Sequence, residues 1–237
     1  MTHHHKTTHD PKGEHETKYV LNSSAASIII EWLQCRCQWD PEFPKGIVSS
    51  IYYDTRDWQF LREKINSDYF KTKVRIRWYA DIVSEEPSTE SYLEVKHKIG
   101  GRREKLRIKT GKPGEWVSRI NLDNRELLEI PRLLWPESVV IRRPCFPVFK
   151  ITYKRLRFIE PVTGARLSFD YDICAPEVNW QMVPRINPFR LQEAVFELKG
   201  NLTQLPETLH QLTALGCRKQ SFSKYSMCYQ KIMRIRV

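Results

Sequence analysis

The chain has 237 residues, of which 39 are Lys or Arg and 28 are Asp or Glu, and its formal net charge is +11. With 41% hydrophobic residues, 9 Gly and 14 Pro, the composition excludes collagen-like and broadly disordered chains. No apolar run is long enough to cross a bilayer and no leader opens the sequence, so we expect a cytoplasmic protein. The excess of positive charge favours a polyanionic partner, which can be nucleic acid, nucleotide or polyphosphate.

The pattern predicts a flexible tail at residues 1–13 and a single strand-rich domain at 14–237. Period-two alternation with β-branched and aromatic residues predicts eight strands, at residues 14–21, 47–54, 71–79, 91–98, 103–109, 149–159, 166–171 and 192–199. Helical patterns predict helices at residues 23–37, 57–64, 123–134, 206–215 and 223–232. Ser23 or Ser24 is available as the N-cap of the first helix.

Many of these strands carry charges on one face only. Residues two apart in a strand project from the same side, so Lys73, Arg75 and Arg77 share one face while Val74 and Ile76 cover the other. The same alternation recurs at residues 94–98, 105–109, 153–157 and 197–199. On the charged faces, cations heavily outnumber carboxylates.

Two interpretations of these faces remain open. The charged side of an ordinary antiparallel sheet faces water. Alternatively, the sheet closes into a barrel whose cations line a water-filled lumen and whose apolar residues face outward under helices. Crowded like charges repel unless a polyanion lies between them, so the second interpretation predicts a phosphate chain, with a divalent metal bridging phosphate and carboxylate.

The residues that open the first strand carry a recognisable motif. Glu14, Glu16 and Lys18 resemble the E-x-E-x-K signature of the triphosphate tunnel metalloenzymes, the CYTH-like superfamily. Further motifs are similar to those of the VTC domain, the polyphosphate polymerase branch of that superfamily, and extend to about Tyr229. They are Lys18-Tyr19-Val20-Leu21, Ser50-Ile51-Tyr52-Tyr53-Asp54-Thr55, Lys73-Val74-Arg75-Ile76-Arg77-Trp78-Tyr79, Leu93-Glu94-Val95-Lys96, Phe196-Glu197-Leu198-Lys199 and Ser221-Phe222-Ser223-Lys224-Tyr225.

The resemblance implies an α+β fold, an eight-stranded antiparallel β-barrel that forms a tunnel with a polar lumen and flanking helices. It implies Mn²⁺ or Mg²⁺ as cofactor. It implies that the reacting phosphates are held by Lys18, Arg75, Arg77, Lys96 and Lys224. It implies further substrate contacts from Lys98, Lys105, Tyr153, Arg155, Arg166 and Lys199. It implies metal ligation by Glu197, the principal ligand, with Glu14, Glu16 and Glu94. Asp54 and Asp170 each end a strand, and orienting an arginine or satisfying a turn are equal alternatives for them.

The implied chemistry is phosphoryl transfer, in which catalysis consists mostly of positioning and electrostatic stabilisation. A polyphosphate polymerase using the γ-phosphate of ATP is the first hypothesis. A tripolyphosphatase or nucleoside triphosphatase is the second, and a noncatalytic polyphosphate-binding module is the third. The expected partners are ATP and inorganic polyphosphate or triphosphate, and no nucleic acid is expected. Export of a product would need a membrane partner, and the sequence makes no prediction of oligomeric state.

Overall fold

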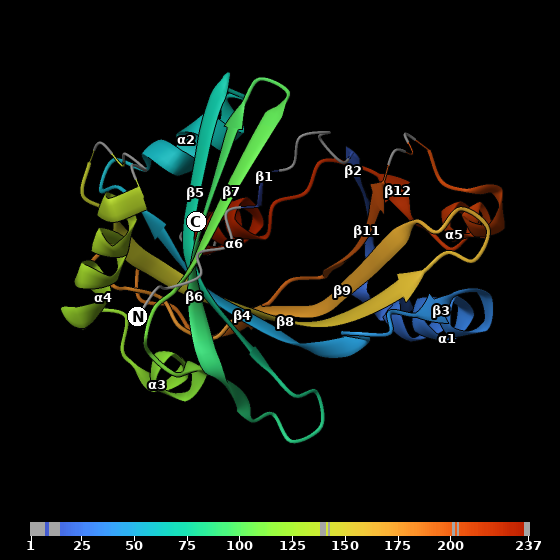
Figure 1. The fold of residues 1–237 in the computed structure, drawn as a ribbon, viewed down its shortest axis with the longest axis horizontal. Coiled ribbons are helices and arrows are strands. Elements are labelled where there is room, and N and C mark those ends of the chain that lie inside the picture. The colour runs from blue at the N-terminus through green and yellow to red at the C-terminus, as the bar shows by residue number, and fades with distance from the viewer. Residues whose placement is uncertain are drawn as a thin grey trace.

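One antiparallel sheet organises the molecule (Figure 1). The computed structural model describes residues 8–9, 15–137, 141, 143–200, 202 and 204–234. Within these residues twelve strands join the sheet along the path β1-β7-β6-β5-β4-β8-β9-β11-β2-β12, while β3 (Gln38–Trp39) pairs with β8 and β10 (Phe189–Arg190) pairs with β9.

Eight of these strands are long, and they are the eight that the sequence predicts. They are β2 (His15–Asn22), β4 (Lys45–Asp54), β5 (Phe70–Ala80), β6 (Pro87–Ile99), β7 (Arg102–Lys109), β8 (Phe146–Ile159), β9 (Arg166–Ala175) and β11 (Glu193–Gly200). Period-two alternation located all of them because both faces of the sheet are used, one for an apolar core and one for charge. The α+β, antiparallel part of the fold prediction is therefore confirmed.

Among the described residues the sheet does not close on itself, so the predicted barrel is not confirmed. No pairing among the described residues joins β7 to β2. Instead, β1 (Thr8–His9) pairs with β7 and β12 (Arg218–Lys219) pairs with β2, so a two-residue strand occupies each edge and limits further pairing there. Thr8 and His9 belong to the predicted tail at 1–13, and the rest of that range lies outside the described residues.

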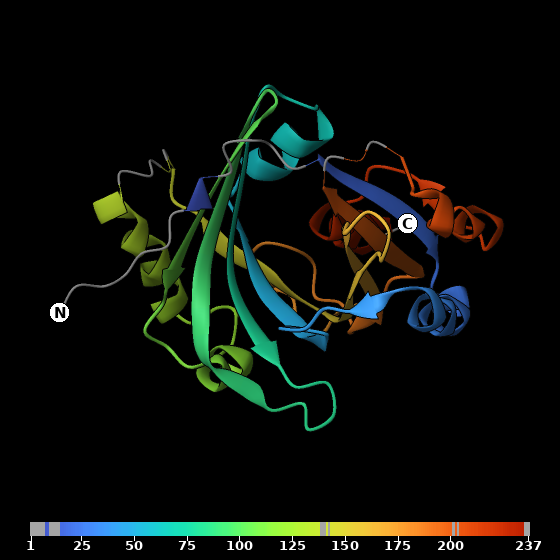
Figure 2. The same cartoon turned by 45° about the vertical axis from the view of Figure 1, so that its right-hand side comes forward.

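The sheet curves so that its two halves flank a common concave face (Figure 2). Strands β5, β6 and β7 form one flank, and β9, β11 and β2 form the other. The two flanks act on each other electrostatically, since Glu16 on β2 and Lys199 on β11 both shift the pKa of Lys96 on β6. In place of the predicted tunnel, the described residues form a curved sheet with one concave face.

Helices cover the convex side of both halves. The helix that starts as a 3-10 turn at Ser23–Ala25 and continues as α1 (Ala26–Arg36), together with α5 (Gln211–Ala214), packs on β2, β8, β9 and β11. The segments α3 (Gly114–Arg119) and α4 (Glu126–Glu129) pack on β5, β6 and β7. Fully burying one large apolar side chain in such a core contributes about 1.5–3 kcal/mol, which fixes the direction in which each strand faces.

Four predicted helices are confirmed in position, although each is shorter than predicted or partly 3-10. Besides α1 and α5, these are α2 (Gln59–Ile65) and the stretch formed by α4 and a 3-10 helix at Ile130–Glu137. The first helix is capped by Asn22, whose Oδ1 accepts from the amide of Ser24, and not by Ser23 or Ser24. No described helix has the length and apolar character needed to cross a membrane.

Helix α3 was not predicted, and its position depends on a glycine. A Cβ at Gly114 would lie 2.5 Å from the carbonyl oxygen of Ser88 on β6. The missing side chain lets the helix approach the strand closely, while Val117 enters the core at 0% exposure. Six residues are too few for a helical period to stand out in the sequence.

Helix α6 (Lys224–Arg234) is confirmed as the last helix, but it lies on the concave side instead of flanking the sheet. The ring of Tyr225 stacks between Tyr52 of β4 and Phe149 of β8, at centroid distances of 5.2 and 5.1 Å. Cys228 and Ile232 continue this apolar contact at 0% exposure. The helix therefore covers one end of the concave face with apolar side chains.

A buried carboxylate ties α6 to the sheet. Asp54, at the end of β4, accepts hydrogen bonds from the amides of Thr55, Phe60 and Leu61 at 2.8, 2.9 and 3.0 Å and from the hydroxyl of Tyr225 at 2.7 Å. Burial raises the pKa of Asp54, and these four donors oppose that rise. Asp54 therefore caps α2 and anchors α6. Of the two roles considered for it, Asp54 satisfies the backbone amides of a turn and does not orient an arginine.

Replacing Tyr225 by phenylalanine should lower the free energy of unfolding by about 2 kcal/mol, because buried Asp54 loses one of its four donors. Urea denaturation measures the change. Tyr229→Phe is the matched control, since Tyr229 lies in the same helix against Trp58 and its hydroxyl makes no hydrogen bond among the described residues. Equal stability of the two variants would contradict the anchoring role.

Candidate active site

The charged side chains of the long strands gather on the concave face. On β5, Lys73, Arg75 and Arg77 lie on this face, while Val74 and Ile76 are 0% exposed in the convex core. The apolar residues of β6, β7, β9 and β11 likewise face the helices. Of the two interpretations left open by the sequence, the structure therefore supports inward-facing charge.

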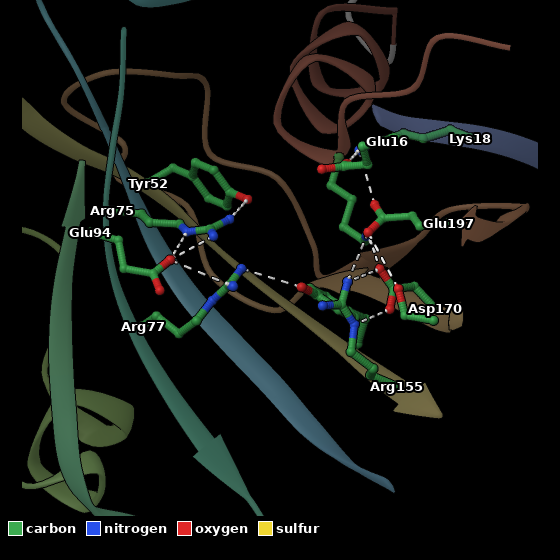
Figure 3. Close-up of polar contacts among 12 residues, drawn as sticks. Glu16, Lys18, Tyr52, Arg75, Arg77, Glu94, Arg155, Asp170 and Glu197 are labelled. Carbon is green, nitrogen blue, oxygen red and sulfur yellow. Dashed lines mark hydrogen bonds and ion pairs between the residues drawn. The ribbon is translucent and has the colours of Figure 1, made fainter. Parts of the chain in front are cut away.

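Glu94 on β6 holds the cations of one flank (Figure 3). Its carboxylate accepts from Arg75 at 2.6 and 2.9 Å, and Lys105 lies at 3.1 Å. Arg77 and Arg107 are farther away, at 3.6 and 3.8 Å. Burial by itself would raise the pKa of Glu94, but these cations, Arg75 foremost, hold that pKa well below its usual range. Glu94 is therefore a permanent anion that orients arginines.

Asp170 and Glu197 hold the cations of the other flank (Figure 3). Asp170 on β9 accepts both ends of the Arg155 guanidinium, at 2.5 and 2.6 Å, and binds Lys224 of α6 at 2.5 Å. Glu197 on β11 contacts Lys18 at 2.9 Å and Arg155 at 3.4 Å. Burial opposes ionisation of both acids, yet Arg155 lowers the pKa of Asp170 and Lys18 lowers that of Glu197.

Tyr153 lies between the two ion clusters, because its hydroxyl accepts from Arg77 while Arg155 and Lys224 lie over its ring. Arg77 donates to the hydroxyl of Tyr153 at 3.3 Å and to Ser50 Oγ at 3.2 Å. Arg75 donates to the hydroxyl of Tyr52 at 3.1 Å. Both arginines are therefore fixed from two sides, which reduces the reorganisation required when a ligand binds between the flanks.

The cations of the concave face are not fully balanced. They are Lys18, Lys73, Arg75, Arg77, Lys96, Lys105, Arg107, Arg155, Lys199 and Lys224, against the carboxylates Glu16, Glu94, Asp170 and Glu197. Among the described residues, Lys73, Lys96 and Lys199 have no carboxylate oxygen within 4.0 Å. Lost hydration, opposed in part by Tyr52 and reinforced by nearby cations, lowers the pKa of Lys73 to about 8. Lost hydration and Arg75 also lower the pKa of Lys96. The described part of the face therefore carries more cations than carboxylates.

Glu16 and Glu197 are the acidic pair best placed for a divalent cation. Both lie 2.9 Å from the same atom, Lys18 Nζ, so their oxygens already converge on one positive centre. The described residues contain no group of three or more ligating side chains, and Glu14 lies outside them. Two carboxylates nevertheless suit Mg²⁺ or Mn²⁺ when phosphate oxygens and water complete the coordination.

The structure brings most of the predicted site residues onto this one face. Arg166, Lys98 and Glu94 differ from the others in position. Arg166 and Lys98 lie at the rim, where Arg166 is 66% exposed and 3.8 Å from Asp40. Glu94 sits among cations and not beside Glu16 and Glu197, so its metal role remains a prediction that the geometry does not favour.

Four residues of the site were missing from the predicted set. The alternation placed Lys73 and Arg107 on the same strand faces as Arg75 and Lys105, but no site role was assigned to either of them. Asp170 had an open role, and it is the central acid of its flank. Tyr52 carries no charge, and only the pairing of β4 with β5 reveals its position opposite Arg75.

Glu94→Gln should lower the free energy of unfolding by about 3 kcal/mol at neutral pH, because several buried cations lose their common anion. The pKa of Glu94 is lower in the folded state, so the deficit should persist down to about pH 4 and shrink only at lower pH, where the unfolded chain takes up its proton first. Chemical denaturation across pH measures this.

Glu90→Gln is the matched control for Glu94→Gln. Glu90 lies on the same strand and pairs with Lys109, but it is solvent-accessible, so its loss should cost less than about 1 kcal/mol. A Glu94 variant that behaves like the Glu90 variant would contradict the role of Glu94 as a shared anion.

Comparisons with solved structures find proteins that are similar to this chain. A candidate adenylate cyclase from Bacillus halodurans has a solved structure with a TM-score of 0.51 and 12% identity, over 89% of this chain and 93% of that one. A protein of Pyrococcus horikoshii OT3 aligns over 89% of this chain and 94% of its own, with 12% identity and a TM-score of 0.41. No curated protein sequence matches the chain.

The first of these structures shows the fold, and the family follows from the sequence. The VTC domain matches residues 13–233, which takes in every long strand, the concave face and α6. The chain belongs to the VTC domain family.

Proposed function

We propose that the chain transfers the γ-phosphoryl group of ATP to the end of a polyphosphate chain lying along the concave face, with Mn²⁺ or Mg²⁺ as cofactor. Membership of the VTC domain family supports phosphoryl transfer on triphosphate or polyphosphate at a general level. The cation pattern of the concave face supports the finer assignment to a polymeric substrate.

The observation that carries the proposal is a ladder of like charges across β5, β6 and β7. Lys73 is directly opposite Lys96, which is opposite Lys105, and Lys71 is directly opposite Lys98. Like charges directly opposite in a sheet are destabilising, so the pattern is unfavourable without a bound anion. From Lys71 to Arg77, β5 covers about 20 Å, which is longer than three linked phosphates require.

The arginines and the lysines have different tasks in this proposal. Arg75, Arg77 and Arg155 are held by carboxylates and hydroxyls, so their planar groups can fork onto the phosphate undergoing transfer. Lysines such as Lys71 and Lys98 are mobile point charges that hold a chain without fixing its register. A divalent cation at Glu16 and Glu197 would supply further positive charge for the phosphate oxygens.

The carboxylates of the concave face are not suited to activate water for hydrolysis. Activating water requires a base with a pKa near the operating pH. On the described part of the concave face, Glu16, Glu94, Asp170 and Glu197 all contact cations and have lowered pKa values. A terminal phosphate is already an anion and needs no such base. The product that forms from ATP distinguishes the proposal from the two alternatives, a tripolyphosphatase and a noncatalytic binding module.

Purified protein incubated with ATP and Mn²⁺ should form polyphosphate chains, resolved by gel electrophoresis, in step with ADP. Arg75→Gln should reduce the rate at least about a hundredfold, since it removes a donor that stabilises transition-state charge. Arg119→Gln, an exposed cation on α3 outside the face, is the control and should keep full activity. Free phosphate without chains would assign a hydrolase, and neither product would assign a binding module.

The double variant Lys71→Gln/Lys98→Gln should bind long-chain polyphosphate several-fold more weakly and tripolyphosphate as tightly as the unmodified protein. For the long chain, the slope of log affinity against log salt concentration should be smaller in magnitude than that of the unmodified protein by about 1 to 2. Isothermal titration at several salt concentrations measures both quantities. The double variant Arg119→Gln/Arg132→Gln removes equal charge elsewhere. Equal weakening for both ligands, or for neither, would count against an extended chain at this ladder.

A further inference from the structure

The concave face differs at its two ends, and we infer that the end marked by Tyr79, Tyr92 and Arg107 binds the nucleobase of the donor nucleotide, so that the phosphate chain extends toward Lys71 and Lys98. This inference rests on the proposed function. It adds a polarity to the site and a subsite that recognises a planar base.

The end opposite the lysines carries stacked planar groups. The Arg107 guanidinium lies 3.7 Å from the centroid of the Tyr92 ring and 5.6 Å from that of Tyr79. Arg107 also donates a long hydrogen bond of 3.5 Å to the Tyr79 hydroxyl. Nucleobases stack favourably on aromatic rings and on arginine planes, and such stacking contributes about 1–3 kcal/mol per base.

Contacts with neighbouring side chains hold the stacked groups in place. The hydroxyl of Tyr92 donates to Glu90, and Glu90 is paired with Lys109. Arg107 Nε is buried without a hydrogen-bond partner among the described residues, and its ionic contact with Glu94 is 3.8 Å long. Arg107 is therefore positioned mainly by stacking and leaves the oxygens of Glu94 to Arg75 and Lys105.

The floor beside these rings is less charged than the rest of the face. Val48 of β4 is directly opposite both Tyr79 and Tyr153, so these three side chains form one row across β5, β4 and β8. Val48 and Tyr153 are buried, and Tyr79 remains partly open. A row of this kind suits an apolar, planar group more than a phosphate, whose oxygens require cations.

The spacing along β5 fits a nucleoside triphosphate. Tyr79 is two residues beyond Arg77 and four beyond Arg75, which corresponds to about 7 and 13 Å along the strand. The ribose with the α- and β-phosphates, which leave together as ADP, would bridge this interval between a base at Tyr79 and the γ-phosphate at the arginines. On the other side of Arg75, only Lys73 and Lys71 follow on this face, which suits a chain without a base.

A comparison of two ligands of equal charge tests the subsite without altering the protein. ATP should bind about tenfold more tightly than ribose 5-triphosphate, which lacks the base, when both are titrated calorimetrically with Mg²⁺. Equal affinities would overturn the inference while leaving the proposed function standing. Failure of tripolyphosphate itself to bind would overturn both.

Variants then locate the base. The double variant Tyr79→Leu/Tyr92→Leu should abolish the tenfold preference for ATP and leave tripolyphosphate affinity within about twofold. Tyr79→Phe/Tyr92→Phe keeps both rings and should retain the preference, which also shows that the site tolerates substitution. Tyr69→Leu, at an exposed ring elsewhere, is the control. A preference for ATP that survives the leucine substitutions would place the base elsewhere and overturn the assignment.

Discussion

The arrangement of the molecule depends on the balance between buried carboxylates and the cations that they hold. Glu94 on one flank, and Asp170 and Glu197 on the other, are almost fully buried, and each contacts at least two cations. Removing charged groups from water is expensive, and the mutual attraction compensates only when the geometry is good. These acids hold the arginines toward each other across the concave face, yet they do not neutralise the neighbouring lysines.

The remaining positive charge links the fold to the proposed chemistry. The pKa of Lys73 is lowered chiefly because the side chain is withdrawn from water, and nearby cations lower that pKa further. A bound phosphate chain would reverse that effect and offset the repulsion along the ladder. Helix α6 contributes to the same site, since Lys224 binds Asp170 while Tyr225 is anchored by Asp54. Helix α6 therefore positions one of the cations of the face.

The sequence was sufficient to locate the strands and to identify the strand faces that carry positive charge. The face on which a strand residue lies depends only on its position along that strand. Lys73, Arg75 and Arg77 could be assigned to one face without knowing which strands are neighbours. The open edges, the burial of α6 on the concave side and the pairing of Arg155 with Asp170 depend on contacts between distant segments. A periodic pattern contains no information about such contacts. A metal site at Glu197, Glu14, Glu16 and Glu94 was predicted from a motif. The structure places Glu16 beside Glu197 and Glu94 apart from them, and Glu14 lies outside the described residues.

The central claim is that the concave face is built for a linear chain of phosphates, and the dependence of thermal unfolding on chain length tests it most directly. At equal total phosphate, stabilisation of the protein should rise from orthophosphate through tripolyphosphate and continue to rise for chains that cover the ladder from Arg77 to Lys71. Stabilisation that depends only on total phosphate, or that single-stranded DNA reproduces at the same salt concentration, would contradict the claim.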